Sequence, residues 1–435
     1  MNTPTRYGIL FCSFFFALLE ISFAQHVPGY NYEESNVRPY TLLDPLTLGG
    51  GGVVRTAGDW WQRRRPEILE LFREDVFGRV PPGAYVPLRY RIVESNRPAL
   101  DGKATRSQVT IYLTPQREAG LKMHLLLYLP VHPRHRSAVI LGLNFGGNQT
   151  VSRDPGILLS PVWSKAKSAA LPERGVPGEA TRGSQAQEWQ ADMIVARGYG
   201  LATVYYGDIE PDFKASMQMG IRQAFLHDGQ TAPAPDEWGA LSAWAWGLSR
   251  AVDYLQSDKR VDAKRIAVTG HSRLGKAADW AAAEDQRFAA VLSTESGKGG
   301  QSLYRRNLGE TIGHLEHSFP YWFCENYRQW VDHDDRIPVD GNLLLSLIAP
   351  RPLYVASAAG DEWSDPRGEF ESAVSASRVY ALLGRHGLES TETRAVDRSV
   401  QHDVGYHVRS GKHDVTAFDW AQYLDFLDLH FGRDK

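Results

Sequence analysis

Short apolar runs alternate with longer runs of helical periodicity through most of the chain. The apolar runs are continuous rather than alternating, which is typical of strands covered on both faces of a parallel sheet. They span residues 138–144, 201–206, 265–269, 289–294 and 352–357. The clearest helical run between two of them covers residues 238–255. The pattern predicts an α/β fold of three layers, with a mostly parallel sheet between two layers of helices.

Residues 25–435 show no sign of a division into separate domains. No linker, charge block, low-complexity tract or internal repeat interrupts them. Two stretches are less regular. One, about 151–188, is rich in Pro, Gly, Ser and charged residues, and the other, about 305–342, holds five aromatic side chains within residues 319–328. We expect a single domain with long loop insertions at these two places.

The first 24 residues predict a secretory signal peptide. Arg6 supplies a positive charge, residues 7–23 are mostly apolar, and the segment ends in the small residue Ala24. Glu20 and the short apolar span argue against a permanent transmembrane helix, which needs about 20 apolar residues. We therefore expect cleavage after Ala24 and a secreted or periplasmic protein.

The composition argues against several classes of partner. The chain has 48 basic and 51 acidic residues and a net charge of −3, so it lacks the charge surplus that attracts nucleic acid or anionic membranes. Cys324 is the one cysteine after the predicted signal peptide, so we expect no internal disulfide. A chain of this length buries a large core without one. We expect a monomer with no nucleic-acid or membrane partner.

The strongest chemical signal is the run Gly-His-Ser-Arg-Leu-Gly-Lys from Gly270 to Lys276. It follows an apolar run and precedes an Ala-rich helical run, which is the context of the nucleophile elbow of α/β-hydrolases. The second glycine, Gly275, comes one residue later than in the usual Gly-x-Ser-x-Gly motif. An ordinary strand-to-helix turn with a capping serine is the simpler alternative. The context favours Ser272 as a nucleophile and the α/β-hydrolase fold.

A serine nucleophile needs a histidine base, which in α/β-hydrolases comes last in the chain. His413 stands three residues before Thr416, the predicted N-cap of the last helix, and Thr416 and Asp419 form a capping box. His402 and His407 are nearby alternatives, but they fall earlier, in the strand-like approach to this loop. The position favours His413.

Two carboxylates qualify as the acid that orients the histidine. Glu295 ends the apolar run 289–294, and Asp361 follows the run 352–357. The position after the later strand is the commoner one in α/β-hydrolases and favours Asp361. Glu295 opens into a glycine-rich turn that would bring it to the same site. The residues alone leave both acids open.

The residues beside the serine suggest further roles. The backbone N–H of Arg273 faces the position of the developing oxyanion, and its guanidinium would add a charged donor. Lys276 lies about one helical turn from Ser272 and so on the same helix face. The turn from Asn144 to Asn148 would supply a second oxyanion N–H. This chemistry requires no metal ion and no organic cofactor.

The same residues resemble the glucuronoyl esterases, carbohydrate esterase family 15. The absence of disulfide cysteines is closer to the bacterial than to the fungal members. The resemblance covers most of the chain after residue 24, in the right order. It rests on the runs Asn144-Phe-Gly-Gly-Asn148, Gly270-His-Ser-Arg-Leu-Gly-Lys276, Arg305-Arg-Asn-Leu-Gly-Glu-Thr311, Phe319-Pro-Tyr-Trp-Phe-Cys324, Gly360-Asp-Glu-Trp363 and Gly411-Lys-His-Asp414.

The resemblance implies a substrate and further site residues. The enzyme would cleave esters of (4-O-methyl-)glucuronic acid, as in lignin–xylan cross-links, and Lys276, Glu310 and Trp363 would contact the sugar. The acid of most members matches Glu295, and some bacterial members place or duplicate it at the position of Asp361. We expect the two acids to share the role, with Glu295 slightly dominant.

Two other functions remain as alternatives. One is a different carbohydrate esterase, which removes acetyl or feruloyl groups and binds the sugar on the alcohol side. The other is a catalytically silent carbohydrate-binding protein on a hydrolase scaffold, which the intact serine, histidine and acids disfavour.

Overall fold

The computed structural model describes residues 27–116, 120–131, 135–164, 171–389 and 395–432. The predicted signal peptide lies outside the described residues.

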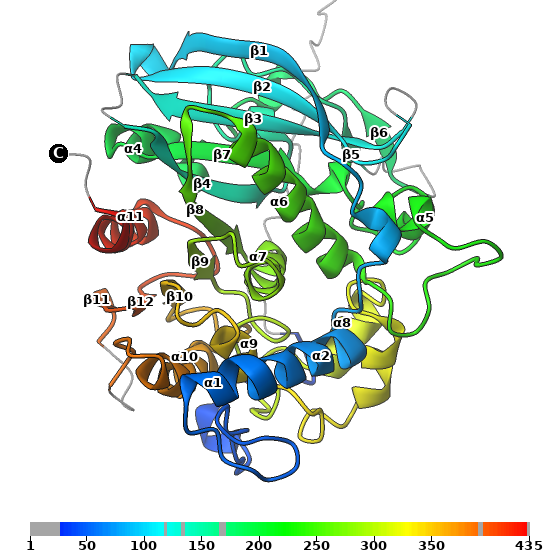
Figure 1. Cartoon of the computed structure of the whole chain (residues 1–435), viewed down its shortest axis with the longest axis vertical. Coiled ribbons are helices and arrows are strands. Elements are labelled where there is room, and N and C mark those ends of the chain that lie inside the picture. The colour runs from blue at the N-terminus through cyan, green and yellow to red at the C-terminus, as the bar shows by residue number, and fades with distance from the viewer. Residues whose placement is uncertain (1–26, 117–119, 132–134, 165–170, 390–394, 433–435) are drawn as a thin grey trace, which may run out of the picture.

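Within the described residues, ten strands form one sheet in the order β1-β2-β3-β7-β4-β8-β9-β10-β12-β11 (Figure 1). The six strands from β7 to β12 in this order are parallel to one another. The five predicted strands are all among them, so the α/β-hydrolase fold is confirmed. The predicted five are β4 Ser137–Asn144, β7 Gly200–Tyr205, β8 Val261–His271, β9 Ala290–Thr294 and β10 Leu353–Ala358, and the sixth parallel strand is β12 Val404–Arg409.

Antiparallel strands complete both edges of the sheet. β1 (Arg89–Ala99), β2 (Ala104–Tyr112) and β3 (Lys122–Pro130) form a meander that joins β7, and β11 (Arg398–Gln401) pairs with β12. The apolar pattern of the sequence did not predict these strands. β1 is exposed over most of its length, as a polar edge strand is. β2 buries polar side chains, among them Arg106 and Gln108, and therefore lacks the pattern of an apolar run.

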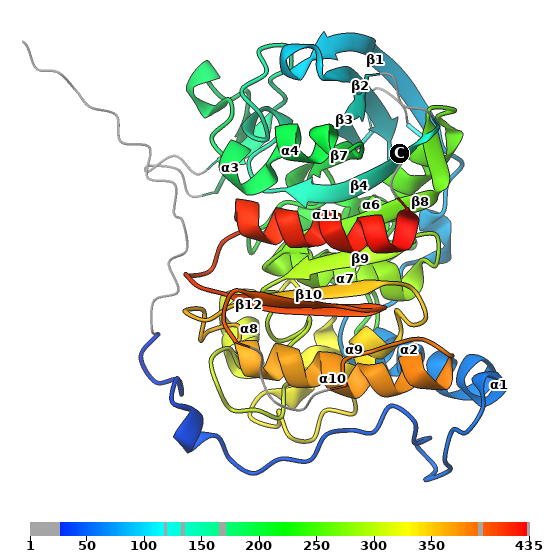
Figure 2. The ribbon, with the colours of Figure 1, turned by 90° about the vertical axis from the view of Figure 1, so that its left-hand side faces the viewer.

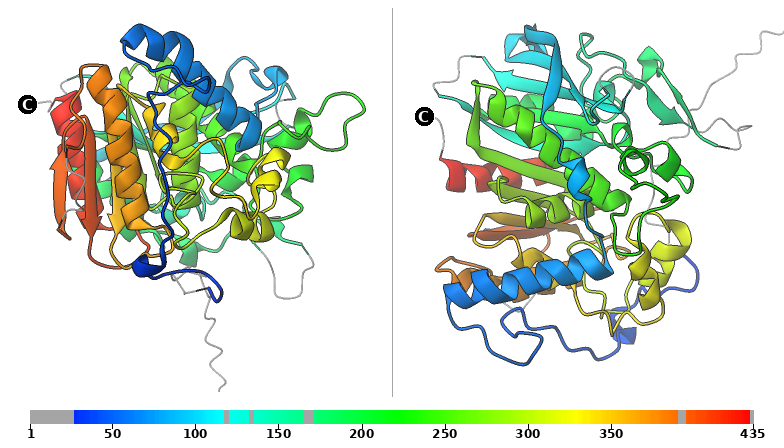
Figure 3. Two further views of the ribbon diagram at one scale, coloured as in Figure 1. Left: turned by 90° about the horizontal axis from the view of Figure 1, so that it is seen from below. Right: turned by 45° about the vertical axis from the view of Figure 1, so that its right-hand side comes forward.

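Helices cover both faces of the sheet, as predicted. One face carries α6 (Ala240–Ser257), α7 (Arg273–Glu284), α9 (Gly341–Ser346) and α10 (Pro366–Leu382), with α2 (Arg65–Asp75) next to α9 (Figure 3). The other face carries α4 (Ala191–Ala196) and α11 (Ala417–Phe431), which lie in front in Figure 2. In the described chain the two layers bury separate hydrophobic clusters, and this burial is the main source of stability.

Shorter elements occupy the connections. In the expected insertion 151–188, β5 pairs with β6 in a separate two-stranded sheet. In the expected insertion 305–342, Phe323 and Tyr327 are buried and stacked, with ring centres 4.1 Å apart. The short elements are α1 Ala57–Asp59, β5 Val162–Ser164, β6 Glu173–Gly175, α3 Ala186–Trp189, α5 Ile221–Ala224 and α8 Ile312–Ser318. A π-helical segment, Trp60–Arg64, joins α1 to α2, and the 3-10 segments are Glu34–Asn36, Pro82–Ala84, Leu100–Gly102, Asn148–Thr150, Glu179–Thr181, Tyr206–Asp208, Ser216–Gln218 and Glu325–Trp330.

None of the helices in the described residues is both long enough and apolar enough to cross a membrane.

Candidate active site

The serine elbow lies between β8 and α7. Ser272 has φ 57° and ψ −131°, a conformation that is strained for any residue with a side chain. Its N–H donates to the carbonyl of Thr294 at 3.0 Å, and its carbonyl accepts from the N–H groups of Gly275 and Lys276 at 2.8 and 3.1 Å. These bonds tie the turn to β9 on one side and to the first turn of α7 on the other.

The two glycines of the motif permit this tight turn. A Cβ atom on Gly270 would lie 2.1 Å from the carbonyl oxygen of Leu274, so the chain cannot pass here with a larger residue. A Cβ on Gly275 would lie 2.9 Å from the Cβ of Ser296, in the loop after β9. The second glycine, although displaced by one residue, therefore allows the same close approach of helix and strand as in the usual motif.

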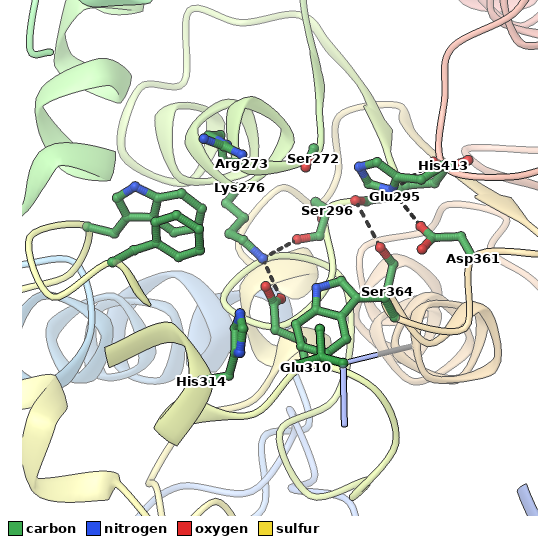
Figure 4. A pocket seen from close by; sticks show the side chains of 14 residues that line it. Ser272, Arg273, Lys276, Glu295, Ser296, Glu310, His314, Asp361, Ser364 and His413 are labelled. Atoms are coloured by element: carbon green, nitrogen blue, oxygen red, sulfur yellow. Dashed lines mark hydrogen bonds and ion pairs between the residues drawn. The ribbon is translucent and has the colours of Figure 1, made fainter. Parts of the chain in front are cut away.

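All eight predicted site residues border one cavity of about 250 Å³. Figure 4 shows Arg273 and Lys276 to one side of Ser272 and the group of His413, Glu295 and Asp361 to the other. The cavity lies at the carboxyl ends of the parallel strands, where α/β sheets bind ligands. Its lining is Val27, Ser272, Arg273, Lys276, Glu295, Ser296, Glu310, His314, Phe319, Trp322, Asp361, Trp363, Ser364 and His413.

Both candidate acids contact the same nitrogen of His413. Nδ1 lies 2.6 Å from Oδ2 of Asp361 and 3.1 Å from Oε2 of Glu295. His413 comes from the loop between β12 and α11, as predicted. The alternatives lie elsewhere: His407 is buried within β12 and bonded to Asp419 at 2.8 Å, and His402 precedes β12, so neither belongs to the cavity lining of the described residues.

The two acids favour the charged form of the histidine. Burial opposes the imidazolium, but Asp361 and then Glu295 outweigh it and raise the pKa of His413 to about 10. Burial likewise opposes the carboxylate of Asp361, and the charge of His413 outweighs it and lowers the pKa of Asp361. The neighbouring His271, whose ring centre is 4.4 Å from that of His413, has a pKa lowered by burial and by this charge.

The surroundings of the two acids differ. Glu295, at φ 48°, accepts from Arg409 Nη2 at 2.8 Å and from the N–H of Asp414 at 2.9 Å, so its charge has partners besides the histidine. Asp361 makes the shorter contact with His413. The geometry therefore favours Asp361 as the main orienting acid, in contrast to the expected slight dominance of Glu295.

The guanidinium of Arg273 is held in a charged and aromatic environment. Nη1 donates to Oδ2 of Asp212 at 2.5 Å, and the group lies 5.0 Å from the ring centre of Trp322 and 5.5 Å from that of Phe319. Burial opposes its charge, but Asp212 outweighs burial and raises the pKa of Arg273. Asp212 was not predicted from the sequence, although an acid shortly after strand β7, at the same sheet edge, was the available signal.

Lys276 and Glu310 form a buried ion pair on the cavity floor. Nζ donates to Oε2 of Glu310 at 2.8 Å and to the carbonyls of Ser296 and Lys298, each at 2.6 Å. All three ammonium protons thus have protein acceptors, so a ligand hydroxyl that accepts from Lys276 has to share or replace one of them.

Trp363 stands edge-on to His314, with ring centres 4.6 Å apart, and to Tyr30 at 5.5 Å. His314 lines the cavity but was not predicted. The turn after β4 is also near, because the ring of Phe145 lies 5.8 Å from the Arg273 guanidinium. The N–H of Gly147 in this turn donates to Asn144 Oδ1 at 2.8 Å and is therefore not available to an oxyanion.

Three residues place metal-type donor atoms together. Among the described residues, a nitrogen of His271, an oxygen of Glu295 and a nitrogen of His413 lie within 4.8 Å of one another. His413 Nδ1 already bonds to Asp361, and Glu295 to Arg409. A metal ion would have to displace the proton of His413, so we assign the cluster to proton chemistry.

A strained serine on an elbow, with a histidine held by carboxylates at the same sheet edge, is the arrangement of a serine hydrolase of the α/β-hydrolase class. Comparison with known proteins narrows this class. Residues 233–384 match a family model described as "Glucuronyl esterase, fungi". The curated "Carbohydrate esterase MZ0003", from an unknown prokaryotic organism, is 43% identical over 402 residues, which cover 92% of each chain.

Solved structures agree. A glucuronoyl esterase from Solibacter usitatus is 47% identical, with a TM-score of 0.88 over 92% of this chain and 100% of that one. A promiscuous CE15 esterase from the marine bacterial metagenome is 42% identical, with a TM-score of 0.85 over the same shares. The chain belongs to carbohydrate esterase family 15, the glucuronoyl esterases, and is a carboxylic ester hydrolase.

The two acids can be separated by isosteric substitution. We expect Asp361→Asn to reduce kcat more than Glu295→Gln, because Asp361 makes the shorter contact, and the double variant to lose more than either. Loss of a sole orienting acid costs up to about ten-thousand-fold. Steady-state kinetics on one ester measure the order, and a larger loss in Glu295→Gln than in Asp361→Asn would reverse our assignment.

Asp361 and Glu295 also determine how kcat/KM depends on pH. His413 acts as a base only when neutral, so kcat/KM rises as pH passes its pKa. Because both carboxylates raise the pKa of His413, removing one negative charge lowers that pKa. Asp361→Asn should therefore move the acid limb of the kcat/KM profile to lower pH, as a pH series will show. A limb that stays in place would mean that it does not report His413.

Proposed function

We propose that the enzyme hydrolyses esters in which glucuronic acid, with or without a 4-O-methyl group, is the acyl part, through an acyl-enzyme on Ser272. The observation that carries the proposal is the buried Lys276–Glu310 pair in the cavity of the serine. A sugar acid offers hydroxyl groups to such a pair, whereas a simple acyl group does not. Curated relatives add support: one from Schizophyllum commune, 26% identical over 80% of this chain, is named 4-O-methyl-glucuronoyl methylesterase.

The geometry supports a division of roles. His413 takes the proton of Ser272 as the hydroxyl attacks the ester carbonyl, and Asp361, assisted by Glu295, orients the imidazole and stabilises its charge. The N–H and guanidinium of Arg273 face the oxyanion, and the fixed position of the guanidinium against Asp212 means that little reorganisation is needed. His413 then protonates the leaving alcohol, and water repeats the sequence to release the acid.

Cavity size argues against the acetyl alternative. The cavity of about 250 Å³ has room for more than ten water molecules, since each needs about 10–15 Å³ of such space. An acetyl group alone would fill only a small part of this space. A feruloyl group would fill the space but would offer few hydroxyl groups to Lys276 and Glu310. A sugar acid both fills the space and brings hydroxyl groups to the Lys276–Glu310 pair, so we favour the sugar as the acyl part.

The natural setting follows from the same proposal. The predicted signal peptide would export the enzyme to the periplasm or the medium. There, esters between glucuronoxylan and lignin alcohols are the polymeric substrates that match the acyl specificity. We propose that it acts as a monomer, without nucleic-acid or membrane partners.

Removal of the nucleophile or the base tests the mechanism. Ser272→Ala and His413→Ala should each lower kcat for methyl glucuronate by several orders of magnitude, because each breaks the serine–histidine unit. Thermal unfolding of both variants should resemble that of the parent. If either keeps more than about a tenth of the activity, the triad is misassigned.

Removal of the ion pair tests the substrate. Lys276→Ala leaves Glu310 buried without its cation, so the matched variant is Lys276→Met with Glu310→Gln, which removes both charges. We expect kcat/KM to fall at least about 100-fold for a glucuronate ester, the loss of two or more sugar hydrogen bonds. An aryl acetate should be affected far less. Equal losses on both substrates would contradict the assignment of this pair to the sugar.

A further inference from the structure

Arg409, the last residue of β12, has no role in the elbow or in the cavity lining of the described residues. Its side chain is nevertheless buried, at 3% exposure of the residue. Buried guanidinium groups are costly unless all their protons have acceptors. The acceptors of Arg409 therefore indicate what the residue holds in place.

The acceptors flank the catalytic histidine. Nη2 donates to the carbonyl of Lys412 at 2.8 Å and to the carbonyl of Asp414 at 2.5 Å, the residues directly before and after His413. The same nitrogen lies 2.8 Å from Oε1 of Glu295. One group thus connects the backbone on both sides of His413 to one of the two acids.

The other side of the guanidinium fixes the group to the scaffold. Nε donates to Oδ2 of Asp419 at 3.0 Å, and Asp419 also accepts from the N–H and hydroxyl of Thr416, both at 2.7 Å, in the capping box of α11. His407 in β12 bonds to the same carboxylate. The histidine loop is therefore anchored at both ends through Arg409 and Asp419.

Arg409 also changes the electrostatics at His413. Two carboxylates next to one imidazole repel each other and together stabilise its charge. The cation lies against Glu295 and offsets its charge, whereas at Asp361 it is mainly the charge of His413 that offsets burial. The other charged or titratable groups around His413 are His271, Asp414, Arg273 and Lys276. Asp419 lies behind Arg409, Glu188 interacts with Asp414, and the buried Glu369 interacts with Asp361 and Glu295.

We infer that Arg409 is a positioning residue that binds Glu295 as a support of the histidine loop and leaves Asp361 to orient His413. It limits the pKa of His413 by offsetting the charge of Glu295. The inference rests on the proposed role of His413 as the base, but the titration of the imidazole tests it without any substrate.

The first experiment measures the His413 pKa by NMR of the imidazole in the parent, Arg409→Lys, Arg409→Met and Arg409→Met with Glu295→Gln. The signal is assigned by its loss in His413→Gln. Arg409→Met should raise the pKa by about one unit or more, because a close opposite charge is lost. Arg409→Lys should leave it near the parent value, and the double variant, which removes both charges, should return it close to that value.

The second experiment compares kcat and KM on an aryl acetate, which any serine esterase of this type should accept. Arg409→Met should lower kcat at least about 30-fold with KM within about threefold, and Arg409→Lys should recover part of this loss. Arg398, exposed on the neighbouring strand β11, provides the matched control. Arg398→Met should change neither kcat nor the His413 pKa.

The outcomes are distinct. If Arg409→Met lowers thermal stability but leaves the imidazole pKa unchanged, or if the double variant keeps the raised pKa, Arg409 does not act on His413 and the inference fails. Should Arg409→Met not fold, Arg409→Lys and Glu295→Gln carry the test. Glu295→Gln alone should then lower the His413 pKa less than Asp361→Asn does, and the opposite order overturns the inference. If the His413 pKa values change as expected but the enzyme does not hydrolyse glucuronate esters, only the proposed function is overturned.

Discussion

The conformation of Ser272 is the constraint on which the rest of the site depends. A non-glycine residue at φ 57° persists only where its surroundings fix it, and here β8, β9 and α7 all do so. The same turn points the first residues of α7 at the cavity, which places Arg273 beside the serine and Lys276 one turn below it. The candidate nucleophile, the proposed oxyanion donor and the proposed sugar contact therefore follow from one bend in the chain.

Paired burial of charge is the second organising principle. Three cations that are mostly removed from water form ion pairs in and around the site. Arg273 pairs with Asp212, Lys276 pairs with Glu310, and Arg409 pairs with both Glu295 and Asp419. Buried pairs of this kind contribute little net stability, but breaking one leaves an uncompensated charge that costs about 3–5 kcal/mol. Their value here is preorganisation, since dipoles and charges that are already fixed do not reorganise during the reaction.

The sequence predicted the parts of the fold in which local pattern and final environment coincide. The parallel strands are apolar because helices cover both faces, and the Ser272 elbow and the His413 loop have strong local signatures. Strand β2 was not predicted because it buries the polar side chains of Arg106 and Gln108. Their partners, such as Asp154 and the N–H of Leu158, are about 50 residues away in the sequence, so no local pattern indicates the burial. In the sequence, residues 63–72 have Pro66 at a helix start and acids in the first turn, a pattern that predicts a solvated helix face. That prediction is wrong for Arg65, which is buried and donates to the carbonyl of Ala283 at 2.7 Å.

The order of strands explains why both acids reach one nitrogen. β8, β9, β10 and β12 are consecutive neighbours, and their carboxyl ends deliver Ser272, Glu295, Asp361 and the His413 loop in that order. Asp361 comes from the strand next to that of the histidine, whereas Glu295 comes from one strand further away. The additional methylene of glutamate covers part of the extra distance, and the backbone of Glu295 has a left-handed φ of 48°. An aspartate after β9 could not approach the imidazole as closely as Glu295 does. The longer acid therefore follows the more distant strand, β9, and the shorter acid follows β10, next to the strand of the histidine.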